Sequence, residues 1–229
     1  MPSETLLQYL ENHITPRRKE LFLKIVSERT RHFTVALENI YQPHNASAVV
    51  RSCECFGIQD LHVIEKENLF KPNEGIVMGA NKWIDLKFYK NSIECLSNLK
   101  KLGYKIIATM PKPENNSMEG VPSFSLDDYD FSLKTVFFFG EESIGLSKEV
   151  IENADGFLHI PMVGFTESFN ISVTVALVLH HLTLKLRNSK NINWKMSEEE
   201  MIEKRIDWAV KSISSGKELL KYYKGKIPI

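Results

Sequence analysis

Apolar residues follow two alternating patterns along this chain. Short, almost continuously apolar runs are typical of strands buried on both faces of a parallel sheet. These runs are 33–37, 61–64, 104–109, 135–139 and 157–160. Elsewhere apolar residues recur every three or four positions, which predicts helices. The helices expected between the strands cover 45–56, 93–102 and 148–154. Strands that alternate with helices predict an α/β domain with a mainly parallel sheet and helices on both faces.

The segment 160–184 joins a polar turn to a long apolar helix. After Asn170, apolar side chains occupy nearly every face, so this helix is expected to be buried on several sides. Glu167, Ser168, Asn170 and Ser172 place hydrogen-bonding side chains at its N-terminus, where free backbone N–H groups are available. Taken alone, Ser168 or Asn170 could simply cap the helix.

Amphipathic helices are expected near both ends of the chain, over 6–12, 16–28 and about 196–223. The last opens with a capping box formed by Ser197 and Glu200. The apolar residues of the helix 16–28 are expected to pack inward, and they are Leu21, Leu23, Ile25 and Val26. The basic residues expected on its outer side are Arg17, Arg18, Lys19, Lys24 and Arg29.

Three loops at the carboxyl ends of predicted strands have an unusual composition. Ligands bind at this edge in open α/β sheets. The loops cover 109–111, 140–145 and 160–170. Their glycines, at 140, 145 and 164, allow a ligand to approach the backbone, although each could equally serve a tight turn. A polar stretch, 66–83, is long for a loop in a compact domain, which favours a functional role.

The composition is that of an ordinary globular protein. Of 229 residues, 43% are apolar and 25% charged, so extensive disorder is not expected. No apolar run has the length of a membrane span, and no secretion signal opens the chain, so a cytoplasmic location is expected. Reduced thiols and no metal site are expected, because only Cys53, Cys55 and Cys95 are present and they lack ligand spacing.

A net charge of zero hides an asymmetry along the chain. Residues 1–31 carry six Lys and Arg against four Asp and Glu, and residues 185–229 carry eleven against six. The middle, 32–184, carries twelve against nineteen. Basic ends are consistent with binding of a polyanion such as nucleic acid. A merely solvated helix face explains the charges equally well.

Three motifs give the chain a specific resemblance. They are LENIYQPHNASAVVRSCECFG (37–57), FFFGEESIGLS (137–147) and IPMVGFTESFNISVTVA (160–176). In this order they resemble the SPOUT class of RNA methyltransferases, in the TrmH family of tRNA (guanosine-2′-O)-methyltransferases. The resemblance implies a deep trefoil knot at about 135–188, S-adenosylmethionine bent into the knot, and a homodimer whose site draws on both subunits.

The resemblance also implies the domains and the cofactor contacts. It divides the chain into a basic N-terminal extension (1–31), a methyltransferase domain (32–188) and a basic C-terminal helix (189–229). Family members hold the cofactor largely through backbone groups. By position these contacts fall at Thr109, Gly140, Ile160, Met162 and Phe169, the last standing where the family usually has Leu.

By the same matching, Arg51 is the expected catalytic arginine and Asn45 orients it or the substrate. Glu142, Ser168 and Asn170 complete the polar site. Because arginine is effectively always protonated, we expect Arg51 to bind a phosphate or to stabilise a developing oxyanion.

Each of these assignments has a structural alternative. Arg51 could pair with Glu54, Glu142 could favour the following helix N-terminus, and Asn45 could be an N-cap.

The resemblance further implies that the basic terminal helices bind tRNA, through Arg17, Arg18, Lys19 and Arg29, and that guanosine 18 of the D-loop is the target. One alternative is 2′-O-methylation of ribosomal RNA or of another tRNA position. The other is a catalytically silent RNA-binding assembly factor.

Overall fold

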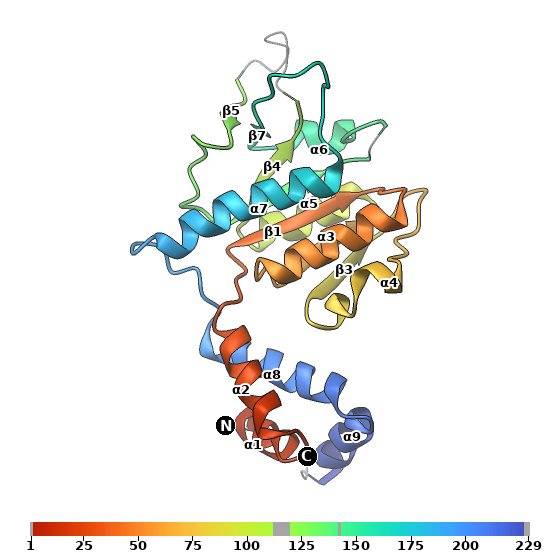
Figure 1. Cartoon of the computed structure of the whole chain (residues 1–229), viewed down its shortest axis with the longest axis vertical. Coiled ribbons are helices and arrows are strands. Elements are labelled where there is room, and N and C mark those ends of the chain that lie inside the picture. The colour runs from red at the N-terminus through yellow and green to blue at the C-terminus, as the bar shows by residue number, and fades with distance from the viewer. Residues whose placement is uncertain (1, 112–119, 142, 227–229) are drawn as a thin grey trace. The chain divides into compact units, whose positions relative to one another are not determined.

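The computed structural model describes residues 2–111, 120–141 and 143–226 (Figure 1). The chain forms two compact units. We call Arg31–Trp194 the sheet unit, and we call Met1–Thr30 together with Lys195–Ile229 the helical unit. The two ends of the chain therefore belong to the same unit. Among the described residues, no helix combines the length and apolar character that crossing a membrane requires.

The described part of the sheet unit contains a sheet of seven strands, in which every neighbouring pair is parallel. In spatial order the strands are β3 (Asp85–Tyr89), β2 (Asp60–Ile64), β1 (Phe33–Glu38), β6 (Thr135–Phe139), β4 (Lys105–Thr109), β7 (Gly156–His159) and β5 (Ser123–Ser125). The predicted α/β class is confirmed. Because β6 lies between β1 and β4, loops that are distant in the sequence leave the sheet side by side.

The two edge strands, β3 and β5, are absent from the sequence-based prediction. Of the residues of β3, only Tyr89 is buried, so this strand has no continuous apolar run. β5 is three residues long. Edge strands are commonly short or partly polar, which removes the signal that identifies central strands. The predicted loop 66–83 contains the short helices α4 (Glu74–Val77) and η1 (Ala80–Lys82).

Helices cover both faces of the sheet, as predicted. α3 (Pro43–Cys55) and α7 (Ile171–Asn188) pack on one face, and α5 (Ser92–Lys101) and α6 (Lys148–Glu152) pack on the other (Figure 1). α3 begins two residues before the predicted start at Asn45. Its N-cap is Gln42, and Pro43 occupies the first turn, where its missing N–H costs no hydrogen bond. Asn45 is therefore not the N-cap of this helix.

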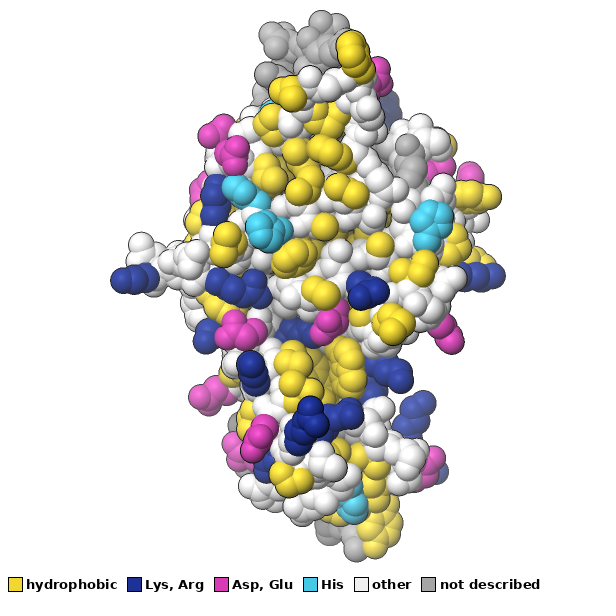
Figure 2. Space-filling view, in the orientation of Figure 1, with side chains coloured by type: hydrophobic (Ala, Val, Ile, Leu, Met, Phe, Trp, Pro, Cys, Tyr) yellow, Lys and Arg dark blue, Asp and Glu magenta, His cyan; other side chains and the backbone are white. Residues whose placement is uncertain are grey.

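The outer side of α7 remains apolar and exposed, although burial on several sides was predicted. Val173, Leu177 and Leu184 are 43%, 39% and 55% exposed. In the loop before α7, Val163 and Phe165 are fully exposed. Figure 2 shows hydrophobic side chains gathered on this face of the sheet unit. A single copy of the chain thus leaves an apolar surface in contact with water.

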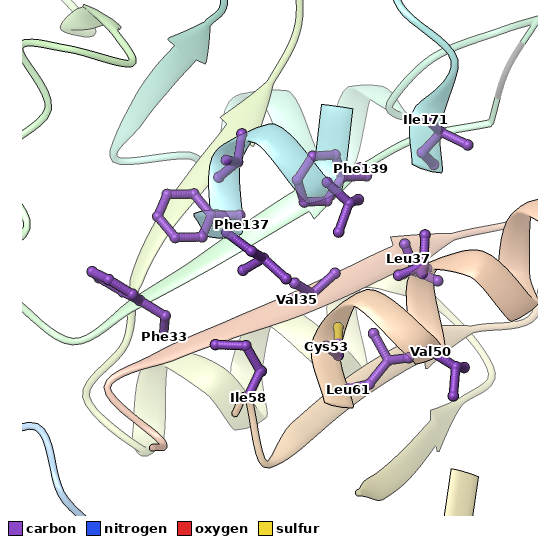
Figure 3. Packing of buried hydrophobic residues seen from close by; sticks show 14 of the residues in the cluster. Phe33, Val35, Leu37, Val50, Cys53, Ile58, Leu61, Phe137, Phe139 and Ile171 are labelled. Atoms are coloured by element: carbon purple, nitrogen blue, oxygen red, sulfur yellow. The ribbon is translucent and has the colours of Figure 1, made fainter. Parts of the chain in front are cut away.

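The main core lies between the sheet and the helices α3 and α7 (Figure 3). Alternate residues of each strand point to opposite faces. In β1, Phe33, Val35 and Leu37 therefore enter this core, whereas Ala36 faces the core beneath α5 and α6. The residues of β6 alternate in the same way, and Phe137 enters the main core. The buried runs of β1 and β6 therefore supply both cores.

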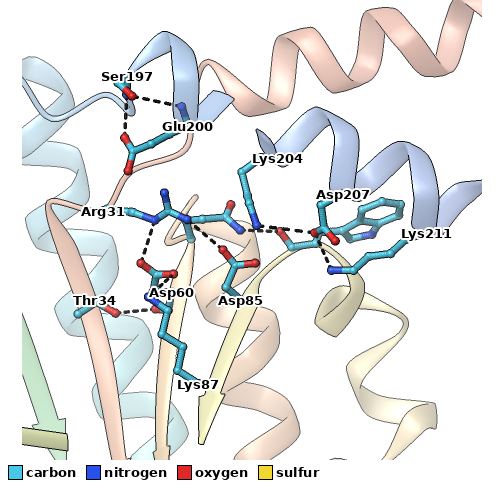
Figure 4. A network of polar contacts seen from close by, with 12 residues as sticks. Arg31, Thr34, Asp60, Asp85, Lys87, Ser197, Glu200, Lys204, Asp207 and Lys211 are labelled. Carbon is cyan, nitrogen blue, oxygen red and sulfur yellow. Dashed lines mark hydrogen bonds and ion pairs between the residues drawn. The ribbon is translucent and has the colours of Figure 1, made fainter. Parts of the chain in front are cut away.

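A network of charged residues joins the amino ends of β1, β2 and β3 (Figure 4). The guanidinium of Arg31 contacts a carboxylate oxygen of Asp60 at 2.9 Å and one of Asp85 at 3.0 Å. Nζ of Lys87 lies 3.2 Å from the other carboxylate oxygen of Asp60. Thr34 Oγ1 donates to the Asp60 carbonyl at 2.6 Å. These contacts compensate the buried carboxylate of Asp60 and fix the start of three strands.

Next to this network, His62 is fully buried on β2. Its Nδ1 lies 2.9 Å from the hydroxyl of Tyr89. Burial, reinforced by the nearby positive charge of Lys87, lowers the pKa of His62 to about 3. Burial also raises the pKa of Tyr89 to about 12. The pair is therefore neutral at physiological pH.

The helical unit is formed by α1 (Pro2–Glu11), α2 (Pro16–Val26), α8 (Glu198–Ser212) and α9 (Gly216–Lys226). The single helix predicted over 196–223 is thus two helices. The turn between them is tight, because a Cβ at Gly216 would lie 2.1 Å from the carbonyl oxygen of Val210. The predicted capping box of Ser197 and Glu200 is present at the start of α8 (Figure 4).

Trp208 is the centre of the helical unit, with 1% of its surface exposed. The ring of Phe22 packs edge to face against it at 5.6 Å between centroids. The predicted inner face of α2 is confirmed for Val26, which is buried, and is wrong for Leu21 and Leu23, which remain 47% and 43% exposed. The face that meets Trp208 runs through Phe22 and Val26, which are four residues apart and so share one side of a helix.

Candidate active site

A cavity of about 510 Å³ lies where the predicted ligand-binding loops leave β4, β6 and β7. Its volume is in the range of small-molecule sites. Gln42 and Asn45, which follow β1, contribute one wall. The other lining residues come from 109–111, 139–145, 158–162 and 167–178. The cavity thus sits at the carboxyl edge of the sheet, where open α/β sheets bind ligands.

The lining favours a cationic ligand with an apolar part. Among the described lining residues, none is Lys, Arg or His, and two are the carboxylates Glu141 and Glu167. Ile160, Met162 and Phe169 supply apolar surface. The sulfonium centre and the adenosyl group of S-adenosylmethionine match this combination of negative charge and apolar surface.

All five residues predicted to contact the cofactor line the cavity. They are Thr109, Gly140, Ile160, Met162 and Phe169. Phe169 is 44% exposed, so much of this apolar residue is in contact with water. The hydroxyl of Thr109 donates to the carbonyl of Phe138 at 2.7 Å, which fixes the loop after β4 to the neighbouring strand. Their roles in binding remain predictions.

Two glycines in the turn after β6 are required by the backbone geometry itself, whether or not a ligand binds. A Cβ at Gly140 would lie 2.2 Å from the backbone carbon of Gly145. Gly145 itself has a φ of +80°, a conformation that other residues rarely adopt. The N–H of Gly145 donates to the carbonyl of Glu141 at 2.8 Å and closes the turn. The predicted catalytic residue Glu142 lies outside the described residues.

Two predicted polar residues from distant motifs are in contact. Nδ2 of Asn170 donates to Oδ1 of Asn45 at 3.2 Å. Oδ1 of Asn170 also accepts the backbone N–H of Ser172 at 2.9 Å, so Asn170 caps α7 while it contacts α3. Asn45 is 3% exposed, and Ser168 lines the same cavity. Asn170 therefore combines the capping role with a place in the site.

Arg51 lies on α3 but does not line the cavity of its own chain. Its Nη1 donates to the carbonyl of Ile76 in α4 at 3.2 Å, so the contact formed is not the alternative pairing with Glu54. The side chain is exposed, and a guanidinium has five N–H donors. An exposed guanidinium of this kind can offer further N–H groups to a substrate.

Glu38, at the end of β1, was missed by the sequence-based prediction. Its carboxylate is buried and accepts hydrogen bonds from the Ser147 N–H at 2.8 Å, the Ser147 hydroxyl at 2.6 Å and the Ser92 hydroxyl. Nζ of Lys66 lies 2.9 Å away. Burial acts to raise the pKa of Glu38, but these hydrogen bonds outweigh it and hold the pKa below the ordinary value. Ser147 occupies the N-cap position of α6, yet its hydroxyl donates to Glu38 and does not cap the helix.

The predicted RNA-binding arginines and lysine of α2 differ in accessibility. Arg17, Arg18 and Lys19 are exposed. Lys19 lies 2.8 Å from a carboxylate oxygen of Glu11. The prediction for Arg29 is corrected, because this side chain is 1% exposed and its guanidinium lies 5.5 Å from the ring centre of Trp208. A side chain enclosed in this way cannot reach a phosphate.

Comparison with known proteins identifies a family whose model, described as the SpoU rRNA Methylase family, matches residues 32–180. A tRNA (guanosine(18)-2′-O)-methyltransferase of Borreliella burgdorferi is 39% identical over 199 residues, which are 87% of each chain. An Aquifex aeolicus protein of the same name is 29% identical and covers 91% of this chain and 94% of its own.

Solved structures show the same fold. The crystal structure of the Aquifex aeolicus TrmH/SpoU tRNA modifying enzyme superposes with a TM-score of 0.73 at 28% identity, over 86% of this chain and 97% of that one. The SpoU methyltransferase AviRb of Streptomyces viridochromogenes, solved in complex with AdoMet, gives a TM-score of 0.59 over 73% and 65% of the chains. At 19% identity, the second likeness concerns the fold alone.

Proposed function

Because this chain belongs to the SpoU methylase family, we propose that it transfers a methyl group from S-adenosylmethionine to the ribose 2′-hydroxyl of guanosine 18 in tRNA. The observation that carries the proposal is the contact between Asn45 and Asn170 at the rim of a negatively lined cavity. It brings two of the three motifs together at one site. The names of the curated relatives supply the target nucleotide.

The proposed cofactor site is the cavity at the ends of β4, β6 and β7. S-adenosylmethionine, when bound, supplies a methyl group already activated by its sulfonium charge. Apolar side chains such as Ile160 and Met162 would pack against its adenosyl part, and the carboxylates of Glu141 and Glu167 would balance its positive charge. The residues of the chain then have to orient the nucleophile and exclude water.

Asn45, Ser168 and Asn170 are the residues proposed to orient the ribose. Their amide and hydroxyl groups can donate to and accept from a 2′-hydroxyl, and Asn45 is held rigidly because it is buried. Arg51 is proposed to bind a phosphate of the target nucleotide or to stabilise the oxyanion that develops as the 2′-hydroxyl loses its proton. Glu142 completes the proposed set and lies outside the described residues.

A homodimer is part of the proposal. The exposed apolar residues of α7 and of the loop before it provide a surface that a second copy would bury; they are Val163, Phe165, Val173, Leu177 and Leu184. Arg51 does not line the cavity of its own chain, which supports a site completed by the partner. The knot expected over about 135–188 belongs to the same proposal, because the chain belongs to the SpoU methylase family.

The helical unit is proposed to hold tRNA, with Arg17, Arg18 and Lys19 as phosphate contacts. The division into 1–31, 32–188 and 189–229 is kept as a functional one, in which both terminal segments act on the same RNA. A cytoplasmic location is proposed as well, because tRNA is the proposed substrate.

The test is methyl transfer to RNA. The full chain is incubated with S-adenosylmethionine labelled in its methyl group and with an unmodified tRNA transcript, and the labelled nucleotide is mapped. Ribosomal RNA is treated in parallel. Label on the ribose of guanosine 18 supports the proposal. Label only on ribosomal RNA or at another tRNA position would show that the target is not guanosine 18. No label on any RNA would favour a catalytically silent RNA-binding factor.

Sharing of the site between subunits has its own test. Arg51→Ala and Asn170→Ala variants are each expected to be inactive and are then mixed under conditions that exchange subunits. If the two residues act from different subunits, a mixed dimer contains one intact site and recovers activity. If they act within one subunit, both sites of the mixed dimer stay defective and the mixture stays inactive.

A further inference from the structure

Asn39 occupies the first position after β1 and has a left-handed backbone, with a φ of +56°. Asparagine tolerates this conformation better than most residues. Its backbone N–H donates to the carbonyl of Ile64 at 2.9 Å, so the residue is fixed to the end of the neighbouring strand β2. This fixed backbone directs the side chain to two separate segments.

The carbonyl side of the amide holds the chain after β2. Oδ1 of Asn39 accepts the backbone N–H groups of Glu67 at 2.9 Å and Asn68 at 3.0 Å. In return, Nδ2 of Asn68 donates to the Asn39 carbonyl at 3.1 Å. The same segment continues to Ile76, whose carbonyl accepts the hydrogen bond of Arg51.

The nitrogen side of the amide holds the turn after β6. Nδ2 of Asn39 donates to Oε2 of Glu141 at 2.8 Å, across 102 residues of sequence. The other carboxylate oxygen, Oε1, accepts the Ser143 hydroxyl at 3.0 Å. Glu141 lines the proposed cofactor cavity, so one amide connects a wall of the cavity to the segment that contacts Arg51.

From this geometry we propose that Asn39 is a positioning residue for methyl transfer, which holds Glu141 in the wall of the cofactor cavity and at the same time fixes the segment that contacts Arg51. The inference rests on the proposed function, because it takes the cavity to be the site of S-adenosylmethionine. Asn39 acts through Glu141 and need not touch the cofactor.

The variant Asn39→Asp distinguishes the acceptor role of the side-chain amide from its donor role. A carboxylate keeps an acceptor for the N–H groups of residues 67 and 68 and accepts the left-handed backbone. It removes the donor to Glu141 and places two carboxylates together, which repel each other. The dissociation constant for S-adenosylmethionine is expected to rise about tenfold or more at pH 8, from the loss of a hydrogen bond to a charged group. The KM for tRNA is expected to stay within about twofold, since the Arg51 side is kept.

The double variant Asn39→Asp/Glu141→Gln reverses donor and acceptor, because the Gln amide can donate to the new carboxylate. It is expected to recover most of the lost affinity. In Asn39→Asp alone, the loss of affinity for S-adenosylmethionine is expected to become smaller as the pH is lowered from 8 to 5, because one of the two facing carboxylates takes up a proton. A merely structural defect would show neither the recovery nor this pH dependence.

Calorimetric titration of the full-length proteins with S-adenosylmethionine measures these affinities, and thermal unfolding checks folding. The matched control is Asn91→Asp, which adds the same charge at the exposed N-cap of α5 and keeps the cap. The inference about Asn39 would be overturned if Asn39→Asp bound S-adenosylmethionine with wild-type affinity, or if the double variant bound it no more tightly than the single one. Neither result would affect the proposed function. A wild-type protein that binds no S-adenosylmethionine would overturn the proposed cofactor site and the inference with it.

Discussion

The side-chain amide of Asn170 donates to that of Asn45 at 3.2 Å, although 125 residues separate the two in the chain. The contact joins the N-terminus of α7 to the first turn of α3. Because Asn45 is buried and Asn170 is also held by Ser172, neither amide can move independently. A rigid pair of this kind can present hydrogen-bonding groups to a ribose in one orientation.

Replacing Asn45 with Ala is expected to lower kcat about 10- to 100-fold, because the ribose loses an orienting group and Asn170 loses its partner. The affinity for S-adenosylmethionine should stay within about twofold, which calorimetry can measure. Ser52→Ala is the control, since its hydroxyl bonds to the carbonyl of Ala48 on the same helix. Equal losses in both variants would point to damage to α3.

For Arg51→Ala, methyl transfer is expected to fall by about 100-fold or more, as for the loss of a group that stabilises charge in the transition state. Folding and cofactor binding should be nearly intact, because the side chain is exposed and makes one hydrogen bond to Ile76. Glu54→Ala should remain active. Turnover by Arg51→Ala at the wild-type rate would remove Arg51 from the catalytic set.

Glu38 is expected to contribute to the acid stability of the fold. Its folded pKa lies below the ordinary value of 4.5, so its contribution is present above that pH and is lost as the pH falls through the folded pKa. Glu38→Gln should lower the free energy of unfolding at pH 7 by about 1–3 kcal/mol, because charged hydrogen bonds become neutral ones. Chemical unfolding at several pH values measures both effects. A variant as stable as the wild type at pH 7 would contradict this account.

His62 should add a pH dependence in a different window. Its pKa is about 3 in the folded protein against 6.5 as the ordinary value, so below pH 6.5 the unfolded chain binds a proton that the folded one does not. Stability therefore falls as the pH drops from about 6.5 towards 3, by up to about 1.4 kcal/mol per pH unit. His62→Gln should make the slope between pH 6 and pH 5 shallower by a similar amount. An unchanged slope would show that His62 is already protonated in the fold.

Binding of tRNA should depend on salt through the exposed basic residues of α2. Arg17→Ala and Arg18→Ala are each expected to weaken binding and to reduce the slope of log K against log salt by about 1 per lost phosphate contact. Lys148→Ala, in the sheet unit, is the control, since Lys148 is exposed and paired with Glu152. Arg29→Ala should instead lower the melting temperature, because Arg29 packs on Trp208.

The central strands could be predicted because β1, β2, β4, β6 and β7 are covered on both faces and so carry continuous apolar runs. β3 and β5 lie at the edges, where one-sided burial and short length leave no such run. The inner face of α2 was misjudged because Leu21 and Leu23 are as apolar as Phe22. Only the position of Trp208, nearly two hundred residues later, selects the side that is buried.

Much of the cavity was predictable because its residues lie in three motifs whose order is specific to a family. Glu38 and Asn39 were missed because their partners, Ser92, Ser147 and Glu141, follow strands β3 and β6, which only the fold brings close to the end of β1. Arg29 was wrongly placed for a related reason. A basic residue beside other basic residues suggests a surface, and an aromatic partner from a distant helix is not visible in the sequence.

The membership of both chain ends in one unit has a consequence for synthesis on the ribosome. α1 and α2 emerge before the sheet unit, yet Phe22 has no Trp208 to pack against until α8 has been translated. The sheet unit can complete its parallel sheet earlier, because all its strands precede Trp194. A chain that stops before α8 would therefore leave Phe22 without the ring against which it packs. The packing of α2 is therefore complete only after α8 has been synthesised.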